Sequence, residues 1–267
     1  MKIGTWIEQR EMMGLPCFSI DEVRAAFPSL SANVLTMSLS RYRAKGRLQA
    51  VHRGFFVVIP PHYALQGRVP DSYYVTQLMT YLKRPYYVSL LSAASLWGAS
   101  HQAVMLTHLM TRLPQSSTSR EKNNTLRWFY RSEIPDEFLV SKNGETAPVV
   151  YSNAELTAVD LVHWAKKIGG LSSVATVLAE LREVTNFTDA AEGVFRTTDV
   201  SDVQRLGYLY EVVLGACAQG SVVHDELKKI SPTLRNVLLV PGGNKVCVRR
   251  DSRWHVDVNE EIEVDDL

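Results

Sequence analysis

The sequence predicts an α+β protein, with a small basic N-terminal part followed by a larger mixed α/β part. Apolar residues recur at helical spacing in some segments and alternate at strand spacing in others. The strand-like segments cluster instead of alternating one by one with helices, which is typical of the α+β class. With 267 residues, 46% of them hydrophobic, the chain is long enough for two domains with separate cores.

Two helices are predicted at the N-terminus. Residues 2–13 carry an apolar stripe at helical spacing, which ends before Gly14. Ser19 and Glu22 have the spacing of a capping box, in which the serine oxygen accepts from an amide of the first turn and the glutamate bonds back. A short helix therefore begins after Ser19, and Pro28 ends it because proline cannot continue a helix.

A third helix is predicted over residues 32–45, with Ser31 as its N-cap. Leu35, Leu39 and Tyr42 recur at helical spacing, so these side chains are expected to face the core. The other positions of this helix carry mostly small polar or basic side chains. The sequence thus predicts an amphipathic helix with a polar, basic outer face.

The charge of the chain is unevenly distributed. Between Arg24 and Arg53 there are six basic residues and no acidic one. Residues 1–85 carry a net charge of +6 and residues 86–267 a net charge of −5. A basic N-terminal part on an acidic body indicates that the N-terminal part meets a polyanion such as DNA. A chance difference between the two parts is the alternative that composition alone leaves open.

A winged helix-turn-helix is the fold predicted for the N-terminal part. Gly46 is expected to end the third helix in the left-handed conformation. Two short alternating runs flank a turn at Arg53 and predict a β-hairpin. Three helices and a hairpin in about 55 residues have the element order of a winged helix-turn-helix. We predict a DNA-binding domain over residues 1–62, a linker over 63–69 and a second domain over 70–267.

The outer face of the third helix, with the hairpin turn, is predicted to bind DNA. Arginine can fork to guanine, asparagine can pair with adenine, and serine or threonine can bond to bases or phosphates. The predicted DNA-binding residues are Asn33, Thr36, Ser40, Arg41, Arg43, Lys45, Arg47 and Arg53. Any solvated helix face contains such residue types, so the prediction depends on the position of this helix before a wing.

The second domain is predicted to mix helices with strands. The expected elements are two helices between Asp71 and Gly98 separated by Pro85, strands over 103–111 and 125–131, two strands within 137–152 around Asn143-Gly144, helices near 154–167, 170–183 and 199–218, and a strand pair over 244–250 and 253–258. This mixture again favours the α+β class.

Several compartments and chemistries are not expected. The cysteines Cys17, Cys217 and Cys247 have no CxxC spacing, so neither a disulfide nor a zinc site is predicted. The first residues lack the apolar core of a signal peptide, and no apolar run approaches the length of a membrane span. These features predict a cytoplasmic protein without a membrane partner.

Five segments, in order, resemble the AbiEi family, the antitoxins of type IV abortive-infection (AbiE) systems. They are RGFFVVIPPHY, YYVSLLSAASLWGA, VVYSNAELTAVDLVHWAKKIGGLSSVATVLAEL, DVQRLGYLYEVV and WHVDVNEEIEVDD. The residues at matching places of the last two segments are Asp202, Arg205, Leu206, Gly207, Trp254, Asn259, Glu263 and Asp265. The resemblance covers roughly residues 20–266.

The resemblance implies a function in two parts. Members of the family are encoded beside a toxin of the nucleotidyltransferase fold. They bind double-stranded DNA at inverted repeats in their own promoter through the winged helix and so repress the operon. Their C-terminal domain counters the toxin, often without a stable complex.

Two alternatives remain open at this point. Asp160 and His163 share a helix face and, with Asp199 and Asp202, could be drawn as the metal site of a nuclease-like enzyme. Core packing with a structural ion pair, for example between Asp160 and Arg205, is the simpler interpretation. Because the chain has no Walker loop, GxGxxG or HExxH motif, we predict no enzyme, no cofactor and no metal. The other alternative is a protein-interaction module that inhibits a partner by direct binding.

Overall fold

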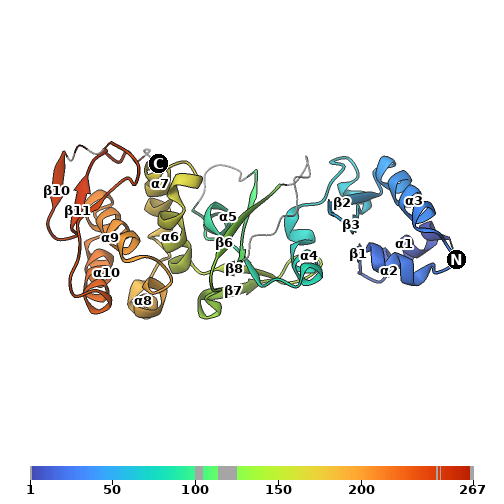
Figure 1. Ribbon diagram of the computed structural model, residues 1–267, viewed down its shortest axis with the longest axis horizontal. Coiled ribbons are helices and arrows are strands. Elements are labelled where there is room, and N and C mark those ends of the chain that lie inside the picture. The colour runs from blue at the N-terminus through green and yellow to red at the C-terminus, as the bar shows by residue number, and fades with distance from the viewer. Residues whose placement is uncertain (1, 100–104, 114–124, 245, 247, 265–267) are drawn as a thin grey trace. The chain divides into compact units, whose positions relative to one another are not determined.

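The fold is α+β, as the sequence predicts (Figure 1). The computed structural model describes residues 2–99, 105–113, 125–244, 246 and 248–264. The helices are α1 Ile3–Met12, α2 Ile20–Ala26, α3 Ala32–Ala44, α4 Val75–Leu82, α5 Leu90–Leu96, α6 Ala154–His163, α7 Leu171–Leu181, α8 Phe187–Phe195, α9 Val200–Tyr208 and α10 Cys217–Ile230. The strands are β1 Cys17–Ser19, β2 Leu48–His52, β3 Phe55–Val58, β4 Tyr86–Val88, β5 Thr107–Arg112, β6 Leu126–Arg131, β7 Leu139–Lys142, β8 Val149–Ser152, β9 Val237–Leu238, β10 Arg249–Asp251 and β11 Val256–Val258. The described strands pair in the orders β1-β3-β2, β6-β5-β4-β8-β7 and β10-β11-β9.

The chain divides into two compact units. Unit 1 comprises Met1–Tyr87, Leu109–Ile134 and Ser141–Val150, and unit 2 comprises Val88–His108, Pro135–Val140 and Tyr151–Leu267. The domain limits predicted from the sequence, at residues 62 and 70, stay predictions.

The first elements of unit 1 follow the order of a winged helix-turn-helix. The order is α1, β1, α2, α3 and the hairpin β2–β3, and β3 lies between β1 and β2 in an antiparallel sheet. The sequence predicts all of these elements except β1, whose three residues are too few for a periodicity. Apolar side chains from the helices and the sheet form one core, with these buried members: Ile3, Ile7, Phe18, Val23, Phe27, Leu35, Leu39, Leu48 and Val58.

Local signals in the sequence set the ends of α2 and α3. The Glu22 amide donates to Ser19 Oγ at 3.2 Å, and the Ser19 amide donates to the Glu22 carboxylate at 2.7 Å, which confirms the capping box. The Val34 amide donates to Ser31 Oγ at 3.4 Å. Gly46 has φ +66°, so it follows α3 in the left-handed conformation that favours glycine. These ends therefore place α3 where the sequence predicts it.

Strand β4 lies between two predicted helices. Two helices separated by Pro85 are predicted between Asp71 and Gly98, and the structure adds a strand over Tyr86–Val88 before α5 begins. β4 pairs in parallel with β8, with Val88 opposite Tyr151. Aromatic and β-branched side chains favour strands, and such a short run carries no readable periodicity. The two helices predicted on either side of Pro85 are therefore confirmed as α4 and α5, and β4 is an additional element that the sequence does not predict.

Other predicted elements of this region are partly confirmed. β6 confirms the strand predicted over 125–131. β5 covers the second half of the run 103–111, of which residues 103–104 lie outside the described part. β7 and β8 confirm two strands within 137–152. The segment between these two strands is longer than a tight Asn-Gly turn.

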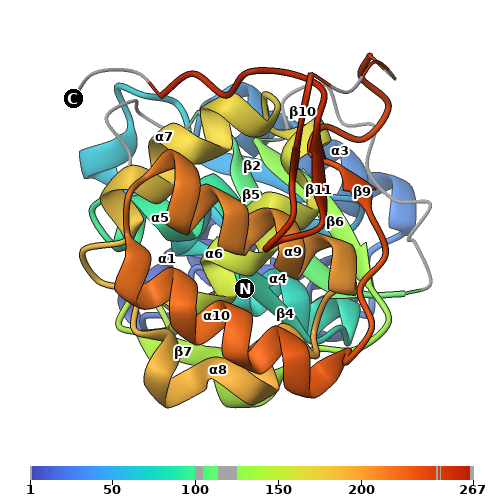
Figure 2. The same cartoon turned by 90° about the vertical axis from the view of Figure 1, so that its left-hand side faces the viewer.

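The helices of unit 2 differ from prediction near the end of the chain. One helix is predicted over 199–218, but α9 ends at Tyr208, passes into a π-helical turn over Leu209–Val213 and is followed by α10. Gly215, with φ +66°, lies in the connection. α10 packs against both α8 and α9, as Figure 2 shows. Neither α8 nor the main part of α10 is predicted from the sequence.

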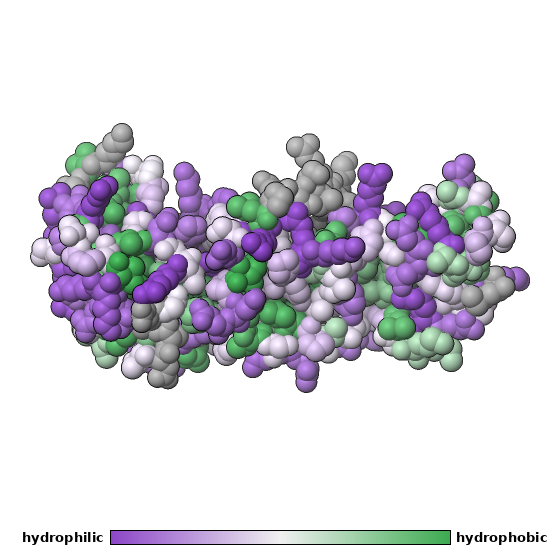
Figure 3. Space-filling model, turned by 60° about the horizontal axis from the view of Figure 1, so that its bottom comes forward, coloured by the Kyte–Doolittle hydropathy of each residue, from purple (hydrophilic) through white to green (hydrophobic). Residues whose placement is uncertain are grey.

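The visible surface is mostly polar. On the face drawn in Figure 3, hydrophilic residues predominate and hydrophobic ones are scattered among them. Within the described ranges, no helix has both the length and the apolar character needed to cross a bilayer.

Candidate nucleic-acid interface

Helix α3 presents the predicted DNA-binding residues to solvent. Its inner side is buried at Leu35 and Leu39, which are 1% and 2% exposed. The side chains on its outer side and at the hairpin turn are all exposed, namely Asn33, Thr36, Ser40, Arg41, Arg43, Lys45, Arg47 and Arg53. Thr36 Oγ1 donates to the Ala32 carbonyl at 2.9 Å, within the helix. The whole predicted set is therefore free of the core and accessible to a partner.

One groove collects residues from α2, α3, the hairpin turn and α4, and we call it the wing groove. It has a volume of about 700 Å³. It is lined by Ile20, Asp21, Arg24, Thr36, Leu39, Ser40, Arg43, Arg53, Gly54, Phe56 and Tyr81. Four of the predicted DNA-binding residues thus meet in one concave surface, although the hairpin and the helix are separate elements.

Most of the cations on α3 and the hairpin are unpaired. Within the described part of the chain, Arg41, Arg43, Lys45 and Arg53 have no side-chain hydrogen bond or ion pair. Arg47 is the exception in the predicted set, because its guanidinium lies 3.4 Å from a Glu11 carboxylate oxygen. Unpaired like charges on one surface repel one another and attract anions, so this surface suits a polyanion.

The geometry of the hairpin turn depends on Gly54 and Tyr81. Gly54 has φ +75°, and its carbonyl accepts from the Ile20 amide at 2.8 Å, which ties the turn to α2. The Tyr81 ring, from α4, lies 5.1 Å from the Phe55 ring. A Cβ at position 54 would also approach the Tyr81 hydroxyl, at 3.1 Å. Tyr81 therefore buttresses the hairpin that carries Arg53, a role that no local sequence signal reveals.

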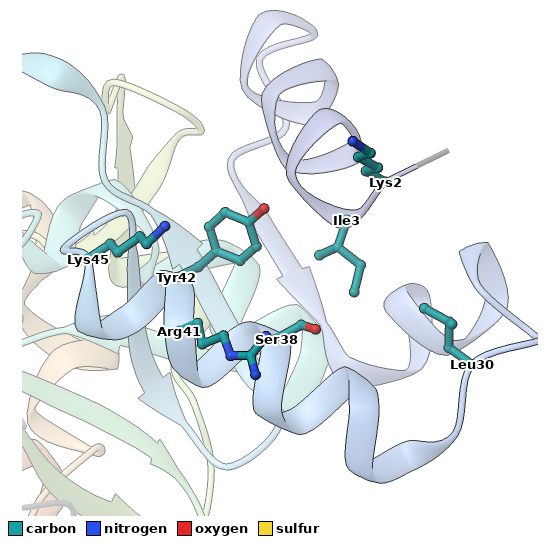
Figure 4. Close-up of a pocket in the computed structure, with 7 residues that line it drawn as sticks. All are labelled: Lys2, Ile3, Leu30, Ser38, Arg41, Tyr42 and Lys45. Atoms are coloured by element: carbon teal, nitrogen blue, oxygen red, sulfur yellow. The ribbon is translucent and has the colours of Figure 1, made fainter.

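A second hollow lies at the other edge of α3, against the start of α1, and we call it the α1–α3 hollow (Figure 4). Its volume is about 470 Å³. It is lined by Lys2, Ile3, Leu30, Ser38, Arg41, Tyr42 and Lys45. The predicted cations of α3 are thus divided, with Arg43 in the wing groove and Arg41 and Lys45 in the α1–α3 hollow. Asn33 and Arg47 line neither.

Unit 2 holds a cluster of charged residues between α6 and α9. Asp202 accepts from Arg205 at 2.7 Å on one carboxylate oxygen and contacts His163 Nδ1 at 2.7 Å on the other. Thr198 also donates to Asp202, at 3.1 Å. Asp160 is the partner of Arg205 that the sequence suggests, whereas the structure pairs Arg205 with Asp202 and buries Asp160.

The ionisation of this cluster matches an ion pair. The hydrogen bond to Asp202 raises the pKa of His163 against the opposing effect of burial. Burial tends to raise the pKa of Asp202, but the hydrogen bond and charge of His163 and the charge of Arg205 together lower it. The charged forms of His163 and Asp202 are therefore favoured.

The same cluster includes the metal candidates of the sequence analysis. The possible ligand atoms of His163, Asp199 and Asp202 lie within 4.8 Å of one another. Both carboxylate oxygens of Asp202 already accept from Arg205, His163 or Thr198, so a metal ion would have to displace these donors. The arrangement favours a structural ion pair between α6 and α9 over a metal site.

Residues of the family-like terminal segments hold the last sheet against α9. Trp254 is fully buried, and a Cβ at Gly207 would overlap the Trp254 ring. Trp254 Nε1 donates to Glu211 at 2.7 Å, and Gln204 Nε2 donates to the Trp254 carbonyl at 2.8 Å. Only glycine at position 207 admits the indole so close to the helix. Gly207 and Trp254, which match the AbiEi-like segments, are thus explained by their packing against each other.

Arg205 and Asn259 complete this attachment. Arg205 Nε donates to the Leu238 carbonyl at 3.0 Å. Asn259 accepts from the Val240 amide at 2.9 Å and donates to the Val240 carbonyl at 3.0 Å. The segments around β9 and β11 are therefore fixed by buried polar contacts as well as by the sheet.

Burial makes the thiol of Cys17 unreactive. Cys17 is buried in β1, and burial raises the pKa of its thiol to about 12 against the opposing charge of Arg10. Cys17 and Cys217 are both free thiols, and Cys247 lies outside the described residues. A thiol with so high a pKa is almost entirely protonated near neutral pH and is a poor nucleophile.

The first elements have the order of a winged helix-turn-helix, and a larger, mixed α/β part follows them. Residues 87–212 match the family model described as the AbiEi antitoxin C-terminal domain. The chain therefore carries an AbiEi antitoxin C-terminal domain, and the resemblance noted in the sequence is confirmed. The match supports an antitoxin role of the AbiEi type for this part of the chain.

A solved structure supports the fold over almost the whole chain. The crystal structure of the RV2827C protein from Mycobacterium tuberculosis is similar with a TM-score of 0.65 at 14% sequence identity. The similarity covers 96% of this chain and 92% of that chain. No curated protein matches the sequence significantly.

Proposed function

We propose that the protein is a DNA-binding transcriptional repressor and antitoxin of a type IV toxin–antitoxin system that acts in phage defence. It represses its own operon and counters a toxin of the nucleotidyltransferase fold. The observation that supports the proposal best is the exposed, unpaired basic face of α3 in a winged helix that precedes an AbiEi antitoxin domain.

In this proposal α3 enters the major groove. Thr36 and Ser40 approach base edges, because they lie on the exposed side of the helix and line the wing groove. Arg53 on the hairpin turn contacts a phosphate or the minor groove. The division follows the positions of the residues: the helix can read sequence, and the hairpin can hold the backbone.

The remaining cations supply affinity that does not depend on sequence. If Arg41, Lys45 and Arg47 join Arg43 and Arg53 in neutralising about five phosphates, log K falls with log salt at a slope of about −4 to −5. Two molecules bind the inverted repeats, with half-sites about one helical turn or a multiple of it apart.

The antitoxic function is assigned to residues 70–267. The matched family domain lies within this range. Neutralisation of the toxin does not require a stable complex in this proposal. The protein acts in the cytoplasm, without a cofactor and without enzymatic turnover.

The test of the DNA-binding role is a titration of the full chain with its own promoter duplex at several salt concentrations. Arg43→Ala combined with Arg47→Ala should make the salt slope less negative by about two, because each lost phosphate contact contributes about one. Unchanged affinity and slope would remove α3 from the interface. A co-purified partner that survives nuclease treatment would instead support direct inhibition by protein binding.

The division of labour has its own test. A fragment over residues 70–267 should protect cells from the cognate toxin while failing to repress the promoter. Protection by residues 1–69 and none by the longer fragment would reverse the assignment.

A further inference from the structure

The α1–α3 hollow has the features of a small-molecule site. Its volume of about 470 Å³ lies in the range typical of ligand pockets. Three cations line it, Lys2 from the start of α1 and Arg41 and Lys45 from α3, and no acidic residue is among its lining. In Figure 4 the hydroxyl of Tyr42 points toward the helix that carries Ile3.

The polar side chains of the hollow are available to a ligand. Within the described ranges, Lys2, Ser38, Arg41, Tyr42 and Lys45 make no side-chain hydrogen bond or ion pair. The Tyr42 hydroxyl lies against the first turn of α1, since a Cβ at Gly4 would collide with it. Three unpaired cations and two unpaired hydroxyls around one concave surface form a donor set suited to a phosphate group.

We propose that the α1–α3 hollow binds a small organic molecule through its phosphate group. Arg41 and Lys45 neutralise the phosphate, with Lys2 on the opposite wall, and Ser38 and Tyr42 donate hydrogen bonds to it. The side chains of Ile3 and Leu30 and the ring of Tyr42 contact the organic part.

The DNA backbone offers the same phosphate chemistry. The hollow is, however, larger than a phosphate group. It also has an apolar wall, formed by Ile3 and Leu30, which the polar DNA backbone would not contact favourably. These two features favour a phosphorylated molecule of the size of a mononucleotide over a backbone phosphate.

Occupancy of the hollow should oppose DNA binding. This step depends on the proposed function, in which Arg41 and Lys45 also neutralise DNA phosphates. A bound phosphate compensates these two charges, so ligand and promoter each weaken the binding of the other by the same factor. The ligand is therefore expected to relieve repression.

The experiment uses the full chain, inorganic phosphate and adenosine 5′-monophosphate as probes, and calorimetric titration. The test variant is Arg41→Gln/Lys45→Gln, and the matched control is Arg43→Gln/Arg53→Gln, which removes two unpaired charges from the wing groove instead. The nucleotide should bind wild type and control alike and the test variant at least about tenfold more weakly. Tyr42→Phe, which keeps the ring, should weaken binding several-fold.

A DNA titration of the same proteins separates the possible sources of phosphate. The nucleotide should weaken promoter binding by wild type and make its salt slope less negative by about two. If neither probe binds, or if the nucleotide binds all variants equally, the proposal is wrong. It is also wrong if Arg41→Gln/Lys45→Gln changes only the DNA salt slope, because the two cations then serve the backbone alone.

The two proposals fail in different ways. Failure of wild type to bind any duplex would overturn the DNA-binding role, whereas nucleotide binding that depends on Arg41 and Lys45 would still establish the hollow. Promoter binding that depends on Arg43, without binding of either probe, would leave the repressor role standing and remove the hollow.

Discussion

Helices α3 and α9 both carry arginines, but those of α3 are exposed and unpaired among the described residues, whereas that of α9 is buried and paired. On α3, Arg41 and Arg43 are exposed and have no partner in the described part of the chain. On α9, Arg205 is only 8% exposed and is held by Asp202 and by the Leu238 carbonyl. A buried charge is tolerated only when it is paired and hydrogen-bonded. An exposed charge is solvated by water and remains available to bind a partner.

The comparison separates residues that keep the fold from residues that are free to bind. Removing the buried contacts of unit 2 should lower the free energy of unfolding. Removing the unpaired cations of unit 1 should leave that free energy almost unchanged and alter binding instead. Four variants test this separation.

The largest effect is expected for Trp254→Ala. The indole is fully buried against Gly207, and its loss leaves a cavity beside α9. The free energy of unfolding should fall by about 3–5 kcal/mol, measured by urea denaturation. Trp254→Phe, which refills part of the space, should cost clearly less. A loss below about 1 kcal/mol for the alanine variant would show that this contact does not hold the last sheet.

Arg205→Ala should come next. It leaves the buried Asp202 carboxylate without one of its two basic partners and the Leu238 carbonyl without its donor, so we expect a loss of about 3 kcal/mol. The control is Arg24→Ala, which breaks an exposed pair with Asp21 and should cost less than about 0.5 kcal/mol. Equal losses for the two variants would contradict the distinction between buried and exposed pairs.

Arg43→Ala/Arg53→Ala tests the unpaired side of the comparison. The free energy of unfolding should change by less than about 0.5 kcal/mol, because both side chains are exposed and unpaired. Promoter binding should weaken by about 2 kcal/mol, measured by fluorescence anisotropy. As a control, Arg253→Ala removes a cation that pairs with Glu211 at 2.9 Å, and it should affect stability more than DNA binding. The comparison would be wrong if Arg43→Ala/Arg53→Ala mainly lowered stability and Arg253→Ala mainly weakened DNA binding.

The smallest effect concerns pH and His163. The pKa of His163 is raised in the folded protein by the hydrogen bond to Asp202, so its stabilising contribution is complete below the ordinary value of 6.5 and is lost as the pH rises through the folded pKa. The pKa of Asp202 is lowered, so its own contribution is lost only at acidic pH. As the pH rises above about 6.5, the wild type should therefore lose stability relative to His163→Gln. If the free energies of unfolding of the two proteins change in parallel with pH over this range, the His163–Asp202 ion pair is excluded.

Features that depend on near neighbours could be predicted from the sequence. The capping box of Ser19 and Glu22, the N-cap Ser31 and the left-handed Gly46 each act within a few residues. The inward Leu35 and the outward Arg43 follow from helical periodicity alone. The short strands β1 and β4 escaped prediction because three residues carry no periodicity, and what forms them is pairing with distant strands.

The sequence by itself determined the α+β class, the winged-helix element order and the polar, basic outer face of α3, because each is encoded in local spacing and composition. Only the tertiary structure decided which cations share a surface, with Arg43 and Arg53 in the wing groove and Arg41 and Lys45 in the α1–α3 hollow. It also decided that Asp202 is the partner of Arg205 and that Gly207 makes room for Trp254. These contacts join residues from separate elements, and long-range packing leaves no periodic signal in the chain.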